Sequence, residues 1–155
     1  MEFLGEDLGR VAKLRVDAKN IEFKGIEPKK MGSIEVAQVG KARVVVCRNS
    51  TKEELKVLLQ DFTLSEAIKD AWVLVADGEF NEEFAAWVRP YVAIVGKEQT
   101  ADYEEYARGW NVDCGTECVH KKCVSLGVDG SAFEVLFGES RENPIGLLSV
   151  KCIND

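Results

Sequence analysis

The sequence is poor in histidine, because His120 is the single histidine among its 155 residues. A catalytic triad of the Ser/His/Asp or Cys/His type could therefore use only His120. The chain also contains no G-x-G-x-x-G and no G-x-x-x-x-G-K-[ST] segment. The glycine-rich loops that bind dinucleotides and nucleoside phosphates are thus absent. The sequence therefore contains none of the short motifs that would assign it to one of these function classes.

Long apolar runs and an excess of positive charge are lacking as well. The longest apolar run is far shorter than the roughly 20 residues that a membrane-spanning helix needs. The first residues have neither the basic nor the apolar region of a signal peptide. The formal net charge is −7, and the Lys and Arg residues are scattered, which disfavours nucleic acid as a partner. We therefore expect a cytoplasmic protein that binds neither nucleic acid nor membranes.

The composition is otherwise that of a globular protein, with 46% hydrophobic and 30% charged residues. A chain of this length predicts a single domain, residues 1–155. It has only three glutamines beside abundant Glu, Lys and Val. This bias is typical of thermophilic proteins, in some of which intracellular disulfides occur.

The N-terminal part predicts antiparallel strands. Between residues 11 and 23, apolar and polar residues alternate, as expected for strands with one buried face. Residues 25–32 predict a loop. Residues 33–39 and 42–47 predict a hairpin closed at Gly40-Lys41. The second arm of this hairpin is apolar throughout from residue 44 to residue 47, so we expect it inside the sheet.

The central part predicts strands separated by helices. Residues 71–76 and 91–95 are apolar runs of the kind that is buried on both faces of a sheet. Two overlapping capping boxes, Ser50 with Glu53 and Thr51 with Glu54, precede a helix. The apolar stripe of that helix is Leu55, Leu58, Leu59 and Phe62.

Further helices follow. A helical turn is expected at residues 65–69, one helix runs from Asn81 to Arg89-Pro90, and another runs from Thr100 to Trp110. Right-handed crossovers place the three connected strands parallel. This part of the chain therefore predicts a βαβαβα parallel block.

The C-terminal part predicts strands again. Residues 123–128 and 132–137 flank Asp129-Gly130, a typical type I′ hairpin turn, and residues 147–153 predict a last strand. The expected fold is a single α/β domain with a mixed sheet. It has antiparallel strands at the N-terminal side, the parallel block in the centre, and antiparallel strands at the C-terminal side.

The first candidate site is the carboxyl edge of the parallel strands, where α/β proteins bind ligands. The candidates for acid, base or charge stabilisation are Asp77, Glu79 and Lys97, and the candidates for ligand binding are Arg48, Asn49, Gly78 and Glu98. Two carboxylates beside a glycine, with cations on neighbouring loops, suit Mg²⁺ and a phosphate, or an acid/base pair. The alternative is that these are solvated loops, with Ser50 only capping a helix.

The second candidate site is the segment between Cys114 and Cys123. Cys114, Cys118, His120 and Cys123 are four soft ligands that could hold Zn²⁺, although the C-x3-C-x-H-x2-C spacing differs from common zinc motifs. A disulfide between Cys114 and Cys118 is an alternative. A thiol activated by Lys121 and Lys122 is another, and simple packing of the cysteines as small apolar residues is a third.

From Ala71 to Phe137, the order of elements resembles the closing half of metallo-β-lactamase-like hydrolases. A strand, a helix ending in Arg89-Pro90, a second strand, a helix and an Asp-Gly hairpin carry the resemblance. The family's metal-binding H-x-H-x-D-H cluster has no counterpart, because the position after the first strand reads Asp77-Gly78-Glu79. The resemblance therefore implies a degenerate, metal-free half, and no site residue is carried over from the family.

Three functions are therefore open. The first is a non-enzymatic binding or assembly domain with a protein partner or a second copy, which would use the strands at the sheet edges. The second is a small enzyme or phosphate-ligand binder at the carboxyl edge. The third is a metal-binding or redox role of the segment from Cys114 to Cys123.

Overall fold

The computed structural model describes residues 8–17, 19–114, 117–126, 132–140 and 146–153. Twelve strands within these ranges form two six-stranded sheets. Sheet A has the order β2 (Ile21–Lys24), β1 (Leu8–Val16), β11 (Ala132–Ser140), β12 (Gly146–Ile153), β8 (Trp110–Cys114), β9 (Glu117–Lys121). Sheet B has the order β10 (Cys123–Leu126), β7 (Val92–Gly96), β6 (Val73–Gly78), β5 (Ala42–Ser50), β4 (Ile34–Val39), β3 (Lys29–Met31).

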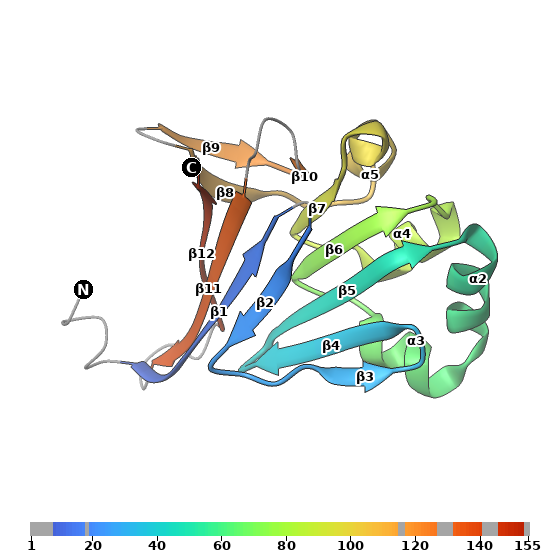
Figure 1. Cartoon of the computed structure of the whole chain (residues 1–155), viewed down its shortest axis with the longest axis horizontal. Helices are drawn as coiled ribbons and strands as arrows, with labels where there is room; N and C mark the ends of the chain where they lie inside the picture. Colours follow the sequence, from blue (N-terminus) through green and yellow to red (C-terminus); the bar gives the residue numbers. More distant parts are fainter. Residues whose placement is uncertain (1–7, 18, 115–116, 127–131, 141–145, 154–155) are drawn as a thin grey trace.

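The helices lie beside sheet B, on the side away from sheet A, as Figure 1 shows. They are α2 (Lys52–Gln60), α3 (Phe62–Ile68), α4 (Glu82–Val88), the 3₁₀ turn η1 (Lys97–Gln99) and α5 (Thr100–Glu104). The molecule thus has three layers, which are sheet A, sheet B and the helices. No helix in the described ranges is both long and apolar enough to cross a membrane.

Two apolar cores separate these layers, and each strand of the parallel block contributes to both. In β5, Val44 and Val46 face sheet A, whereas Val45 and Cys47 face the helices. The same alternation holds in β6 and β7. Successive side chains of a strand point to opposite faces, so a strand covered on both sides must be apolar at every position. This explains the continuous apolar runs of the sequence.

The predicted mixed α/β class is confirmed, and so is the parallel block. β5 pairs with β6 and β6 pairs with β7, both in parallel. The hairpin of β4 and β5 and the antiparallel pair of β1 and β2 are also present as predicted. The strands form two sheets, however, and not the one mixed sheet that we expected. Nothing in the local apolar pattern distinguishes a face covered by a second sheet from a face covered by helices.

Several local predictions were wrong. β10 pairs in parallel with β7 in sheet B, while β11 belongs to sheet A, so the two do not form the expected hairpin. The predicted turn residues Asp129-Gly130 lie outside the described residues. The predicted helix from Thr100 ends at Glu104, and Trp110 begins strand β8. The sequence reading also missed β3 and β9.

One of the two predicted capping boxes of the first helix is confirmed, and the predicted C-terminal extension of its apolar stripe is not. Thr51, and not Ser50, is the N-cap, and its capping box with Glu54 is complete. Ser50 is the last residue of β5 and is buried. Phe62 does not continue the apolar stripe, because α2 ends at Gln60, and Phe62 begins α3 with 79% of its surface exposed.

Two phenylalanines in helices test the packing of the helical layer. Phe84 in α4 is fully buried, whereas Phe62 in α3 is largely exposed. Replacing Phe84 by Ala should lower the free energy of unfolding by about 3–5 kcal/mol, because it leaves a cavity. The matched variant Phe62→Ala should change it by less than about 0.5 kcal/mol. Urea unfolding of both variants measures the difference, and equal losses would contradict the described packing.

Candidate functional site

Asp77 and Glu79 at the end of β6 hold the neighbouring loop after β5. The Asp77 carboxylate accepts a hydrogen bond from the backbone N–H of Asn49 at 2.8 Å, and the Glu79 carboxylate accepts one from the N–H of Lys52 at 2.9 Å. The backbone N–H of Glu79 also donates to the carbonyl oxygen of Ser50. We call these contacts the β5–β6 latch. Both candidate carboxylates thus have partners on the protein's own backbone.

The backbone at the latch explains why the sequence contains Asp-Gly there. The pairing of β5 with β6 shifts register between Cys47 and Ser50, and Asn49 has a φ of 51°, in the left-handed region. Gly78 has a φ of 123°, and a Cβ atom there would lie 2.5 Å from the carbonyl oxygen of Ser50. Only glycine allows the two strands to approach so closely. Asp77 then stabilises the irregular turn at Asn49.

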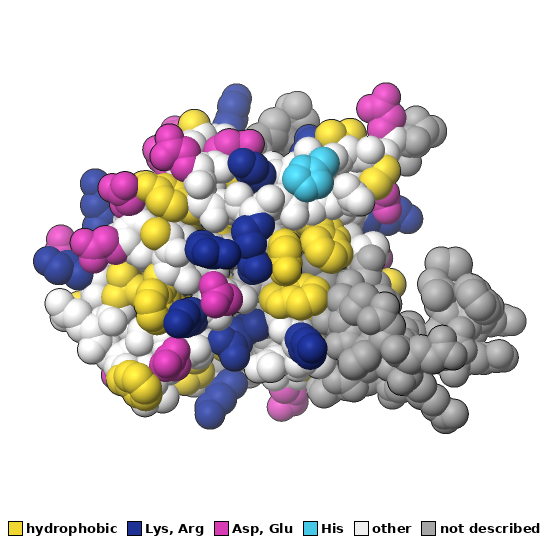
Figure 2. Space-filling model, turned by 180° about the vertical axis from the view of Figure 1, so that it is seen from behind, with side chains coloured by type: hydrophobic (Ala, Val, Ile, Leu, Met, Phe, Trp, Pro, Cys, Tyr) yellow, Lys and Arg dark blue, Asp and Glu magenta, His cyan; other side chains and the backbone are white. Residues whose placement is uncertain are grey.

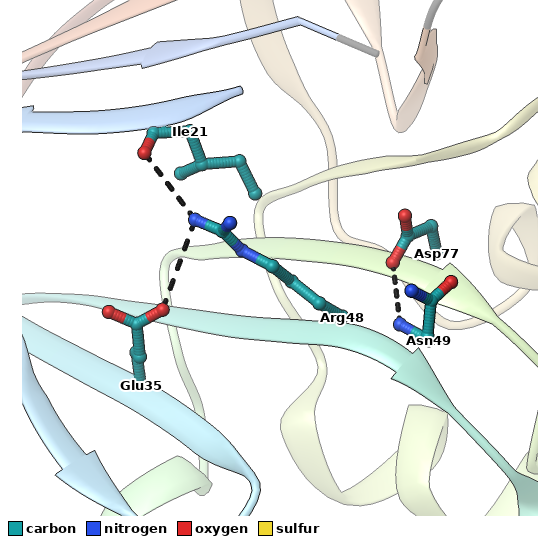
Figure 3. Close-up of polar contacts among 5 residues, drawn as sticks. All are labelled: Ile21, Glu35, Arg48, Asn49 and Asp77. Atoms are coloured by element: carbon teal, nitrogen blue, oxygen red, sulfur yellow. Dashed lines mark hydrogen bonds and ion pairs between the residues drawn. The ribbon is translucent and has the colours of Figure 1, made fainter. Parts of the chain in front are cut away.

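Arg48 points away from Asp77, as Figure 3 shows. Its guanidinium donates to the carbonyl oxygen of Ile21 on β2 at 3.4 Å and lies 3.9 Å from the Glu35 carboxylate on β4. It therefore connects sheet B to sheet A and does not face the candidate carboxylates. Of the other predicted residues at this edge, Glu98 lies in η1 and is exposed, and Lys97 faces a cavity that neither Asp77 nor Glu79 lines.

The four predicted zinc ligands do not converge. Across the antiparallel pair of β8 and β9, Asp113 lies opposite Cys118, and Asn111 lies opposite His120. These four residues are exposed, whereas Cys114 belongs to the half-buried face. Cys118 is therefore on the face opposite to Cys114, which separates the predicted disulfide partners. All five cysteines are free thiols. In the described part of the chain, no group of three or more His, Cys, Asp or Glu side chains could hold a metal ion.

His120 has a packing role. It is exposed on β9, and a Cβ atom on Gly109 would collide with its imidazole ring. Gly109, with a φ of 106°, thus allows the strand to approach the ring.

Figure 2 shows the histidine at the surface, on a face where several Lys and Arg side chains lie together despite the net negative charge of the chain. Positive charge is therefore locally concentrated in this acidic protein.

A cavity of about 420 Å³ is lined by residues of η1, α5 and the strands β8 to β12. Its apolar side chains include Val124 and the buried Phe133. The polar side chains that line it are Lys97, Thr100, Cys114, Lys121, Cys123, Ser125 and Cys152. We call it the cysteine cavity. Among its described lining residues, three are thiols, two are cations and none is acidic.

The topology explains why these residues meet. β7 and β10 are parallel neighbours in sheet B, and β8 and β12 are parallel neighbours in sheet A. Lys97 directly follows β7, and Cys114 is the last residue of β8. The cavity thus lies beside the carboxyl ends of β7 and β8. It is also lined by Cys123, the first residue of β10, and by Lys121, which pairs with Trp110 at the start of β8. The Thr100 hydroxyl donates to the carbonyl oxygen of Lys97 at 3.0 Å and fixes the turn that carries the lysine.

Cys114 and Cys152 are partners in this cavity. They are in register on the parallel strands β8 and β12, and their thiols are joined by a hydrogen bond. Burial raises the pKa of Cys152, and the hydrogen bond with Cys114 raises it further, whereas the charge of Lys121 lowers it.

The other three cysteines also have raised pKa values. Burial raises the pKa of Cys123 to about 12, and its contact with the Glu104 carboxylate adds to this effect. Burial, with a smaller contribution from Asp77, raises the pKa of Cys47 to about 12. The hydrogen bond to Asp113 raises the pKa of the exposed Cys118. A thiol with a raised pKa carries little thiolate, which is the reactive form.

The sequence analysis named four members of this cavity, Lys97, Cys114, Lys121 and Cys123, but assigned them to two separate sites. It missed Cys152, which is 38 positions beyond Cys114 and is brought beside it only by the pairing of β12 with β8. The alternation of β12 places Lys151 outside and Cys152 inside, but this pattern does not identify the partner strand.

The protein partner or second copy that the sequence predicts would bind at the edges of the sheets. β9 is the last strand of sheet A among the described strands, and all five of its residues are exposed. Its Val119 has 36% of its surface accessible. Such an edge can accept a further strand, so pairing at β9 stays a prediction.

Comparison of the chain with protein-family models, with curated proteins and with solved structures found no match. The resemblance to the closing half of metallo-β-lactamase-like hydrolases therefore stays a prediction, and the function must be argued from the residues themselves.

The β5–β6 latch predicts a structural role for Asp77. Replacing Asp77 by Ala should lower the free energy of unfolding by about 1–2 kcal/mol, because the N–H of Asn49 loses a charged acceptor. The variant Asp77→Asn keeps an acceptor oxygen and should lose less. Urea unfolding of both variants tests this order. An Ala variant as stable as the parent would contradict the latch.

Proposed function

We propose that the protein is a binding domain for a small anionic ligand, which occupies the cysteine cavity. The observation that carries the proposal is the pairing of Lys97 and Lys121 at one cavity whose described lining residues include no acidic side chain. The ligand would interact with the two ammonium groups, with the Ser125 hydroxyl as a further donor.

The shape and position of the cavity also support binding. A volume of about 420 Å³ falls within the roughly 300–1,000 Å³ of small-molecule sites. The carboxyl ends of parallel strands are where α/β folds bind their ligands. The cavity combines apolar side chains with a few charged and hydroxyl groups, as ligand sites commonly do. This proposal keeps the predicted role of Lys97 as a cation and places Asp77 and Glu79 outside the site.

The proposal predicts that inorganic phosphate, as a probe, binds through the two lysines. Replacing either Lys97 or Lys121 by Gln should weaken its binding by about five-fold, and replacing both should weaken it further, because each removes one charge from the ligand. Isothermal titration calorimetry at low and at high salt measures the change, and salt should weaken binding to the parent protein.

Lys151 is the matched control, because it neighbours Cys152 on β12 and is exposed like Lys97 and Lys121, but it does not line the cavity. Lys151→Gln removes the same charge and should leave phosphate binding unchanged. If all three single variants weakened phosphate binding equally, the net charge of the protein, and not the cavity, would explain the effect. No measurable binding of phosphate by the parent protein at low salt would overturn the proposal.

A further inference from the structure

The pair formed by Cys114 and Cys152 has the placement of a disulfide that can open and close. The two residues are in register on neighbouring strands, and neighbouring strands lie about 4.8 Å apart. Disulfides bridge Cα atoms that are about 4.4–6.8 Å apart. The thiols already contact each other through a hydrogen bond. The spacing of neighbouring strands thus falls within the Cα range that a disulfide can bridge.

The surroundings of the pair favour reaction with a ligand over a purely structural bond. Both cysteines are half-buried and line the cysteine cavity, so a molecule in the cavity can reach them. Burial and the hydrogen bond with Cys114 both raise the pKa of Cys152, so Cys114 is taken as the attacking thiol. The lysines that line the cavity place positive charge beside the thiols, and such charge favours the thiolate.

We propose that Cys114 and Cys152 form a redox-active dithiol that exchanges with anionic low-molecular-weight disulfides bound in the cysteine cavity. The dithiol itself is inferred from the pairing of β8 and β12. The preference for an anionic disulfide rests on the proposed function, because it needs Lys97 and Lys121 as the anion-binding groups.

The exchange has two steps. The Cys114 thiolate attacks one sulfur of the disulfide RSSR, the S–S bond breaks, and one RS⁻ leaves and takes a proton from water. Cys152 then loses its proton to water and attacks the sulfur of Cys114, which forms the intramolecular disulfide and releases the second RS⁻, protonated to RSH. Two electrons pass from the protein to RSSR, and two molecules of thiol are released.

The other thiols do not fit this role. Cys47 is buried in the core between sheet B and the helices, and Cys118 lies on the exposed face of β9. Cys123 lines the same cavity, but its thiol is hydrogen-bonded to the Glu104 carboxylate, and that negative charge opposes formation of the thiolate. The exposed Cys118 serves as an internal control, because non-selective oxidation should modify it first.

Oxidised glutathione is a suitable probe, because it is a disulfide that carries several carboxylates. Incubation of the full chain with it, followed by alkylation and peptide mass spectrometry without reduction, should show a Cys114–Cys152 disulfide that dithiothreitol reverses. The variant Cys118→Ser should give the same result. Adducts on Cys118 alone, with Cys114 and Cys152 still alkylated as thiols, would overturn the inference.

Single variants test the order of the steps. In Cys152→Ser the second step is impossible, so a mixed disulfide of glutathione with Cys114 should accumulate. In Cys114→Ser the attacking sulfur is absent, and the adduct on Cys152 should form at least about ten-fold more slowly, since burial raises the pKa of that thiol. Equal rates of adduct formation at the two positions would contradict the assigned order. Circular dichroism shows whether each variant is folded.

The preference for an anion is measured as a ratio of oxidation rates, with oxidised glutathione against the neutral hydroxyethyl disulfide. In the double variant Lys97→Gln/Lys121→Gln this ratio should fall by about ten-fold, because electrostatic attraction to the cavity is lost. The ratio should stay unchanged in Lys151→Gln. An unchanged ratio in the double variant would overturn the preference for anions.

The outcomes separate the two proposals. If phosphate binds through the lysines but no Cys114–Cys152 disulfide forms with either reagent, the dithiol inference fails and the proposed function stands. If the disulfide forms equally well with both reagents in the parent and the double variant, and phosphate does not bind, the proposed function fails and the dithiol stands.

Discussion

The structure depends on the burial of the parallel strands of sheet B on both faces. One face of β5, β6 and β7 packs on sheet A and the other packs on the helices. Burying apolar side chains contributes about 1.5–3 kcal/mol for each large residue, and these strands provide such residues to both cores. The parallel arrangement also requires crossover connections, which places α2 and α4 on the helical side. The three-layer architecture follows from this double burial.

The same arrangement determines the chemistry of the carboxyl edge. Where β5 and β6 end, the backbone of β5 leaves its regular path, and Asp77 and Glu79 are used to hold it. Arg48 is likewise engaged, since it reaches from β5 to β2 and Glu35. The polar residues that follow these two strands therefore mostly hold the protein's own backbone and side chains in place. Lys97 after β7 is different, because on the side away from β6 the neighbour of β7 is the short β10, and the cysteine cavity opens beside it.

The cysteine cavity exists because the two sheets bring their parallel pairs together. β7 and β10 contribute Lys97 and Ser125, while β8 and β12 contribute Cys114 and Cys152. Lys121 is the last residue of β9 and lies at the same place. Lysines and cysteines from both sheets thus line one cavity. In the proposed function a small anion binds through the charges of the lysines. In the proposed thiol exchange the hydrogen-bonded pair of Cys114 and Cys152 reacts.

The sequence by itself determined the α/β class, the parallel block and the hairpin of β4 and β5, because apolar periodicity and turn residues act locally. It also identified Lys97, Cys114 and Cys123 as chemically notable residues. Only the tertiary structure decided that the strands form two sheets, that β10 joins β7, and that Cys152 lies beside Cys114. The reason is physical: a strand's alternation shows which residues are buried, but hydrogen bonding between distant strands selects the neighbour. Cys118, only four positions from Cys114, therefore lies on the opposite face, while Cys152 is in contact.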